Sequence, residues 1–513
     1  MEEQVEGLFG VMEVERSQQK DSSSREVGPP RYKPIDRQQL TLKTIDIERL
    51  VEADHAVRGI WEMTGQLDYS GFEGKIRARE GTAGQRTLSP RLLTSLWIYA
   101  LSQGVTSARE LSRMIETDPG CQWLTALETI NPHTLSDFRV DHQSALEKMF
   151  VEVVGLMSAE NLIEMKRVAQ DGTKIRANAG TDTFRREERI RQHLQLAQQQ
   201  IEELNKQEQE EISERVAAAR LRAQREINDR LQQALEELKN IRQTKSKPEE
   251  ARASETDPQA RVMKQSDGGW APSYNVQLTT DSVAGAIIAV DVTQSANDYD
   301  SLAPALKNVA QSFGKKPEQV LTDSGYICRE NIVRTKAEGI DLIGPVPEML
   351  ASAGTQKRQR VAEEFQPQAF QFDKTQNCFI CPAGKTLLLR TTDQRTGMTL
   401  YTYQAKRIDC TNCCFKSQCI SKGDGPRSIV RTVNSDTVQA FIAKMESTEA
   451  KQIYKERSQL SEFANCWIKA KCGLRQFRLR GLIKVRMESL WAALTFNVQM
   501  WVRLVWRHCE GSA

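Results

Sequence analysis

The chain has 513 residues, of which 39% are hydrophobic and 27% charged, a composition typical of a soluble globular protein with several domains. The formal net charge is +3, so overall charge identifies no partner, and a DNA-binding prediction must rest on local basic segments. The first residues lack the pattern of a signal peptide, and the apolar windows at 92–101 and 490–506 are too short or too interrupted to cross a bilayer. We therefore predict a cytoplasmic protein with no membrane partner, whose eleven cysteines are thiols or metal ligands rather than disulfides.

Residues 1–30 are polar and are predicted to form a disordered tail. From 31 to 164 the pattern predicts short helices joined by tight turns. Two interpretations of this N-terminal helical domain stay open. It is either a DNA-binding domain of the helix-turn-helix kind, with Arg109, Arg113 and Arg139 exposed, or an ordinary helical bundle.

The segment after the helices predicts a mixed α/β core over 165–350, which the C-terminal residues 450–513 complete. A strand is expected to end on Asp171, with a turn at Gly172, and a later strand ends on Asp323. If these strands are neighbours, the two carboxylates repel each other unless a cation lies between them. A pair of divalent ions about 4 Å apart is the usual arrangement for phosphoryl chemistry, and it normally requires a third carboxylate.

An insertion at 184–245 is rich in Gln, Glu and Arg, with apolar residues at alternating steps of three and four. This heptad-like seam, broken in its middle, predicts an antiparallel helical hairpin or coiled coil. Its role stays open between a solvated structural hairpin and an arm for self-association or DNA contact.

A second insertion, at 351–449, is rich in cysteine. Two CxxC pairs flank a predicted β-hairpin and suggest a zinc-ribbon-like module with one structural Zn²⁺. The predicted ligands are Cys378, Cys381, Cys410 and Cys413, with Cys419 as an alternative. The 28 residues between the pairs exceed the usual spacing of about 15–20, and unliganded thiols remain the competing interpretation.

The C-terminal segment provides an acid and many basic residues. Glu462 is the candidate third metal ligand, seven residues before Lys469 on one predicted helix. The side chains expected to hold DNA phosphates are Tyr454, Arg457, Lys469, Lys471, Arg475 and Arg478. An amphipathic helix with solvated charges is the alternative.

These motifs together resemble the DDE transposases of bacterial insertion sequences, which have an RNase-H-like core. The first acid matches Gln-Asp171-Gly-Thr-Lys, and the second matches Thr-Asp323-Ser-Gly-Tyr. The third matches a Tyr-Arg-Glu-Lys signature formed by Tyr454, Arg457, Glu462 and Lys469. That signature has three residues between Arg and Glu, whereas this chain has four. Glu462 is nevertheless preferred because its spacing to Lys469 fits, and Glu488 is the second choice.

The resemblance implies that Asp171, Asp323 and Glu462 bind two Mg²⁺ or Mn²⁺ ions. The enzyme would cleave double-stranded DNA at the ends of its element and join the freed 3′-hydroxyl to target DNA. It would act as a homodimer in a synaptic complex, on the nucleoid of a bacterial cytoplasm. Two alternatives are a decayed, non-enzymatic DNA-binding repressor and a nuclease without strand transfer.

Overall fold

The computed structural model describes residues 6–7, 10–11, 44–74, 76, 87–207, 214–244, 247–351, 361–420 and 425–507. The predicted disordered tail lies outside these residues, except for a small ladder between β1 (Glu6–Gly7) and β2 (Gly10–Val11). Residues 1–46 and 47–513 form two compact units, and every element described below belongs to the second.

Helices form the part of this unit that precedes the sheet. They are α1 (Ala56–Thr64), α2 (Ser70–Glu73), α3 (Pro90–Ser102), α4 (Ala108–Thr117), α5 (Pro119–Thr125), α6 (Pro132–Asp141) and α7 (Gln143–Ala159). Arg109 and Arg113 are exposed, as predicted. The expectation for Arg139 was wrong, because this side chain is only 5% exposed. It donates to the Thr106 carbonyl and its guanidinium lies over the Trp97 ring, so it supports the core instead of facing a ligand.

A mixed sheet forms the centre of the unit. In spatial order its strands are β10 (Asp341–Ile343), β9 (Gln319–Thr322), β3 (Arg167–Arg176) and β7 (Trp270–Asp281), and β7 also pairs with β6 (Arg261–Lys264) and β8 (Ile287–Thr293). The first three main strands, β3, β7 and β8, are antiparallel, whereas β9 and β10 extend the sheet in parallel with β3. Helices α10 (Leu302–Phe313) and α11 (Arg329–Ala337) connect β8 to β9 and β9 to β10. This topology confirms the predicted RNase-H-like α/β core.

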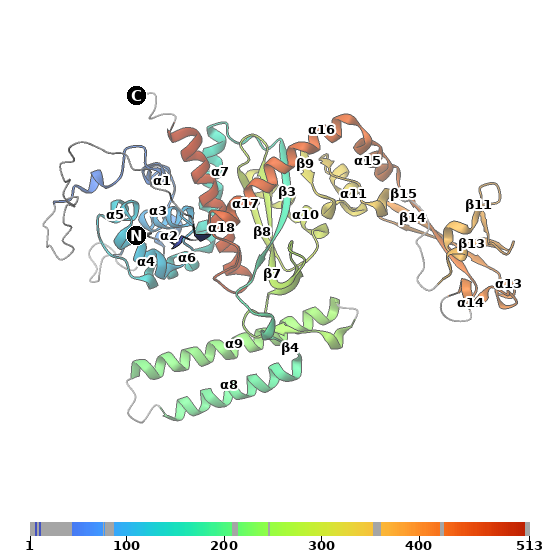
Figure 1. Ribbon diagram of the computed structural model, residues 1–513, viewed down its shortest axis with the longest axis horizontal. Helices are drawn as coiled ribbons and strands as arrows, with labels where there is room; N and C mark the ends of the chain where they lie inside the picture. The colour runs from blue at the N-terminus through green and yellow to red at the C-terminus, as the bar shows by residue number, and fades with distance from the viewer. Residues whose placement is uncertain are drawn as a thin grey trace. The chain divides into compact units, whose positions relative to one another are not determined.

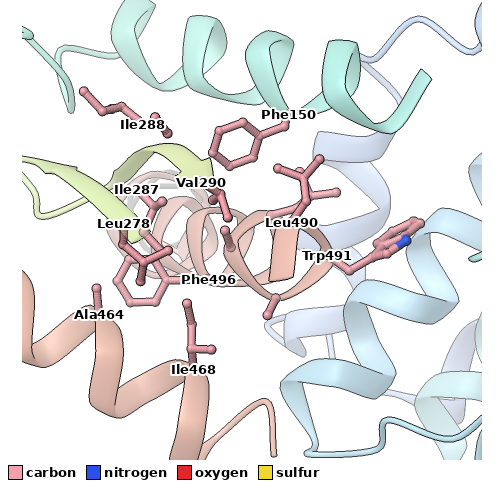
Figure 2. Packing of buried hydrophobic residues seen from close by; sticks show 14 of the residues in the cluster. Phe150, Leu278, Ile287, Ile288, Val290, Ala464, Ile468, Leu490, Trp491 and Phe496 are labelled. Atoms are coloured by element: carbon pink, nitrogen blue, oxygen red, sulfur yellow. The ribbon is translucent and has the colours of Figure 1, made fainter. Parts of the chain in front are cut away.

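The C-terminal helices cover this core. They are α15 (Asp436–Glu446), α16 (Thr448–Arg457), α17 (Phe463–Ala470) and α18 (Leu482–Trp501). Helix α18 is buried along most of its length and contacts α3, α7 and β8 (Figure 1). Figure 2 shows its Leu490 and Phe496 among Phe150 of α7 and Ile287 of β8. The apolar run at 490–506 is therefore a core helix that ties the N-terminal helices to the sheet, and no helix among the described residues has the length and apolar character needed to span a bilayer.

The insertion between β3 and β7 contains two long helices, α8 (Glu187–Gln207) and α9 (Glu214–Thr244). They pack on each other through the predicted apolar seam, which includes the buried Ile190, Leu231 and Leu238. Short strands β4 (Phe184–Arg185) and β5 (Ala253–Ser254) pair where the insertion leaves and rejoins the core. The helical hairpin predicted from the spacing is thus present (Figure 1).

The cysteine-rich insertion contains an antiparallel sheet. Its strands are β11 (Gln371–Asp373), β12 (Cys378–Ile380), β13 (Thr386–Arg395), β14 (Met398–Ala405) and β15 (Ser428–Asn434). Helix α12 (Glu348–Ala351) precedes it, and the short helices α13 (Arg407–Thr411) and α14 (Lys416–Cys419) lie between β14 and β15. The predicted hairpin is β13–β14, which turns at Gly397 with a φ of 74°.

Candidate active site

Asp171 and Asp323 lie at the same level of two neighbouring parallel strands. The pairing of β3 with β9 ends at Gln170 and Thr322, and each acid is the next residue. Burial raises the pKa of Asp171 to about 6; Arg457 opposes this shift and the charge of Asp323 adds to it. Burial also raises the pKa of Asp323. The expectation that these strands are neighbours is correct, and the two carboxyl groups form a desolvated, mutually repelling pair.

One detail of the prediction was wrong, because β3 does not end at Asp171. It continues to Arg176, paired with β7, so Gly172 lies inside a strand instead of in a turn. A Cβ at Gly172 would lie 2.5 Å from both Asp298 Oδ1 and Gln277 Nε2. A larger residue here would displace the ends of these side chains, so glycine is favoured by their close approach and not by turn geometry.

Asp298, in the connection between β8 and α10, is a third acid near this pair that the sequence did not single out. Its Oδ1 accepts hydrogen bonds from Asn275 Nδ2 and Gln277 Nε2, both at 2.7 Å. Its charge contributes to the raised pKa of Asp323, after burial and against the opposing effects of Arg457 and the Gly325 amide. Only the sheet topology indicates Asp298, because the connection that leaves β8 passes the end of the sheet where Asp171 and Asp323 lie.

The C-terminal helices hold both oxygens of Asp171. Arg457 Nη2 lies 3.1 Å from Oδ1, and Asn465 Nδ2 donates to Oδ2 at 2.9 Å. The Gly172 amide donates to Oδ1 at 3.0 Å. Asn465 is a second site residue that the sequence analysis missed, and its spacing of eight residues from Arg457 was the available signal.

A π-helical turn, Ser458–Glu462, separates α16 from α17. In an α-helix two residues five apart point about 140° away from each other, whereas a π-turn closes after one more residue than an α-turn. Arg457 immediately precedes this turn and Glu462, five residues later, is its last residue, and the Glu462 charge acts on the Arg457 guanidinium. All four residues between Arg457 and Glu462 lie in this π-turn, which is one residue longer than an α-turn. Ser461, which strict spacing would make the third ligand, is buried with a hydroxyl that has no hydrogen-bond partner.

Glu462 itself is solvent-exposed. Among the described residues, no group of three or more His, Cys, Asp or Glu side chains is arranged closely enough to hold a metal ion. The structure thus brings Asp171 and Asp323 together and leaves Glu462 outside that pair, on the side of Arg457.

The second-choice acid, Glu488, has different surroundings. Its carboxylate is buried on α18 and accepts hydrogen bonds from the amides of Arg478 and Leu479. Burial raises its pKa, against the attraction of Arg139. Lys484 lies four residues before Glu488 on α18, but the amides of Arg478 and Leu479 hold the carboxylate. Glu488 therefore binds backbone amides of the segment between α17 and α18, and it lies in the core, away from Asp171.

The six predicted phosphate-binding residues fall into two groups. Tyr454, Arg457 and Lys469 lie near the acids, and Arg457 contacts Asp171 directly. Burial opposes the raised pKa of Arg457, to which Asp171 and then Tyr454 contribute. Burial lowers the pKa of Lys469, and the charge of Asp171 opposes this lowering. The other three, Lys471, Arg475 and Arg478, are exposed along the segment that follows α17. The Arg475 carbonyl accepts from the Arg176 amide, so this basic segment runs beside the end of β3.

Comparison with known proteins agrees with these motifs. No curated protein shows a significant match to the sequence. A solved structure titled "Cryo-EM structure of piggyBac transposase synaptic complex with hairpin DNA (SNHP)" aligns with 91% of this chain and 75% of its own, at 8% identity and a TM-score of 0.29, which is too low to support an argument. A family model described as "Transposase DDE domain" matches residues 380–502, which include Tyr454, Arg457, Glu462 and Lys469. Residues 380–502 of this chain are thus similar to the transposase DDE domain.

Proposed function

We propose that this transposase cleaves phosphodiester bonds at the ends of its DNA element and joins the freed 3′-hydroxyl to target DNA. The observation that carries the proposal is the buried pair of Asp171 and Asp323 on adjacent parallel strands, each with a raised pKa. Such a pair is unfavourable by itself and becomes favourable when cations lie between its oxygens.

The residues at this site fit Mg²⁺ or Mn²⁺, which prefer carboxylate oxygens. Asp171 and Asp323 would be ligands, and Glu462 would join them by turning inward from the end of the π-turn. Bound ions would activate the attacking water or 3′-hydroxyl and stabilise charge on the phosphate. Arg457 neutralises Asp171 in the protein alone. When ions take over that role, Arg457 is free to pair with a DNA phosphate, beside Lys469.

The exposed basic segment supports backbone binding of double-stranded DNA. Lys471, Arg475 and Arg478 would contact phosphates and position the duplex against the acids without reading its sequence. We assign sequence recognition to the N-terminal helical domain, residues 31–164. The protein would act as a homodimer that brings two element ends together in a synaptic complex. It would do so on the nucleoid in the bacterial cytoplasm.

A cleavage assay on the DNA that flanks the gene tests the proposal. The protein should nick that DNA only with Mg²⁺ or Mn²⁺ and, when given a free 3′-hydroxyl end and a target plasmid, should join the two. Metal-dependent nicking without joining would support the nuclease alternative. Specific binding with no cleavage in either metal would support the repressor.

A further inference from the structure

Four cysteines line one small cavity at the edge of the sheet β11–β15. Cys381 follows β12, Cys410 lies in α13, Cys413 follows that helix, and Cys419 ends α14. The cavity has a volume of about 30 Å³, more than the roughly 10–15 Å³ that a single water molecule needs. The site can therefore accept an occupant of the size of a single ion.

The backbone around two of these sulfurs donates hydrogen bonds to them. The Lys385 amide donates to Cys381 Sγ at 3.2 Å, and the Arg427 amide donates to Cys410 Sγ at 3.4 Å. The first belongs to a tight turn in which Gly384, at a φ of 71°, donates to the Cys381 carbonyl. Such hydrogen bonds fix the orientation of the two sulfurs, as hydrogen bonds to the ligands of a metal site do.

A positive charge also lies beside this cluster. The Arg427 side chain lines the same cavity as Cys381, Cys410, Cys413 and Cys419. Arg427 is itself only 2% exposed and donates to the Cys419 carbonyl. A buried cation beside four thiols complements the net negative charge that four thiolates and one Zn²⁺ carry together.

The hydrophobic core of this sheet is small. Its buried members are Phe370, Phe379, Leu387, Tyr403, Ala405 and Ile429. Strand β13 is exposed along nearly its whole length, with Leu387 as its one buried residue. Modules with so little buried apolar surface usually need a metal or disulfides to be stable, and the described cysteines are free thiols.

We propose that Cys381, Cys410, Cys413 and Cys419 bind one structural Zn²⁺ as a tetrahedral four-thiolate site. The geometry replaces Cys378 of the predicted ligand set with Cys419, because Cys378 is buried within β12 and does not line the cavity. Among the described residues, no group of three or more His, Cys, Asp or Glu side chains lies close enough to hold a metal ion, so these four thiols would have to move closer together to bind one. Zn–S bonds of about 2.3 Å would draw them inward and fasten α13 and α14 to the turn between β12 and β13.

Metal analysis of the full chain, purified from cells grown with zinc, tests the site. The wild type should contain about one zinc per chain. Cys410→Ser and Cys419→Ser should each lose it. Cys378→Ser and Cys414→Ser are the matched controls and should retain it, the first at a buried and the second at an exposed cysteine outside the cavity.

A second measurement covers the case in which a variant misfolds. Cobalt substitution of the wild type should give the intense sulfur-to-metal absorption of a four-thiolate site. Chelation should expose residues 361–434 to protease while the core stays intact. Zinc retained by Cys419→Ser but lost from Cys378→Ser would overturn the assignment. So would wild-type protein without zinc that binds no cobalt.

Discussion

Arg457 Nη2 lies 3.1 Å from Asp171 Oδ1, so an arginine at the end of α16 neutralises a carboxylate in the middle of β3, 286 residues away in the chain. Both side chains are largely buried, at 12% and 13% exposure. This ion pair replaces, in the protein alone, the positive charge that the proposed ions would bring to Asp171. Under the proposed function, Arg457 would compete with metal for Asp171 and would become available to DNA when metal binds.

Asp171→Asn and Asp323→Asn should each reduce cleavage by at least about 10²-fold, because each removes a charged ligand worth several kcal/mol to the transition state. DNA binding should change by only a few-fold, since the phosphate contacts lie elsewhere. Single-turnover cleavage and a binding titration at the same salt concentration measure both. Cleavage near the wild-type rate in either variant would exclude the site.

Arg457→Gln should separate the two roles of the arginine. Cleavage should fall, and the slope of log Kd against log salt should decrease by about 1, because one phosphate contact is lost. The stabilisation of the protein by Mg²⁺, measured as a shift in Tm, should persist or increase because the competing cation is gone. A Tm shift abolished in this variant would show that Arg457 is needed for metal binding.

Glu462→Gln should be as inactive as the Asp variants, whereas Glu488→Gln should retain cleavage. The Glu488 carboxylate accepts backbone amides in the core, so its replacement should lower the free energy of unfolding by about 1–3 kcal/mol. Lys484→Ala is the control and should leave stability unchanged. Rates in Mg²⁺ and Mn²⁺, with denaturant melts, give the result. If Glu488→Gln is folded but inactive while Glu462→Gln is active, Glu488 and not Glu462 is the third acid.

Deleting the exposed Gln459 should convert the π-turn into an α-turn and leave three residues between Arg457 and Glu462. The two side chains then stay on one face, so cleavage should be retained and stability unchanged or improved. Inserting one alanine after Gln459 is the matched variant and should abolish cleavage, since no regular turn absorbs a second extra residue. Equal loss in both variants would argue against a role for the π-turn in positioning Glu462.

Cleavage at limiting Mg²⁺ should decrease as the pH falls through about 6, where Asp171 takes up a proton. The direction follows from its raised pKa: above about 6 the carboxylate is ionised and able to hold a cation, and below it the neutral acid is not. Because metal competes with the proton, more Mg²⁺ should move the midpoint to lower pH. A midpoint that does not respond to metal concentration would assign the titration to another group.

Local sequence patterns determined most of the fold. Alternating apolar residues indicated β7, the apolar seam indicated the hairpin of α8 and α9, and the order of strands and helices indicated an RNase-H-like core. The same patterns pointed to Asp171 and Asp323, because an acid that directly follows a run of buried strand residues stands out in the sequence.

Tertiary structure alone decided which side chains meet. Asp298 and Asn465 reach the acids through pairing and packing between residues far apart in the chain, and neither lies in a distinctive local motif. Arg139 looks like a surface residue in its helix, yet α18 covers it. Cys378 and Cys381 form one CxxC pair, but only Cys381 lines the cavity with Cys419. Local periodicity specifies the elements, whereas contacts depend on register and long-range packing, which no short stretch of sequence contains.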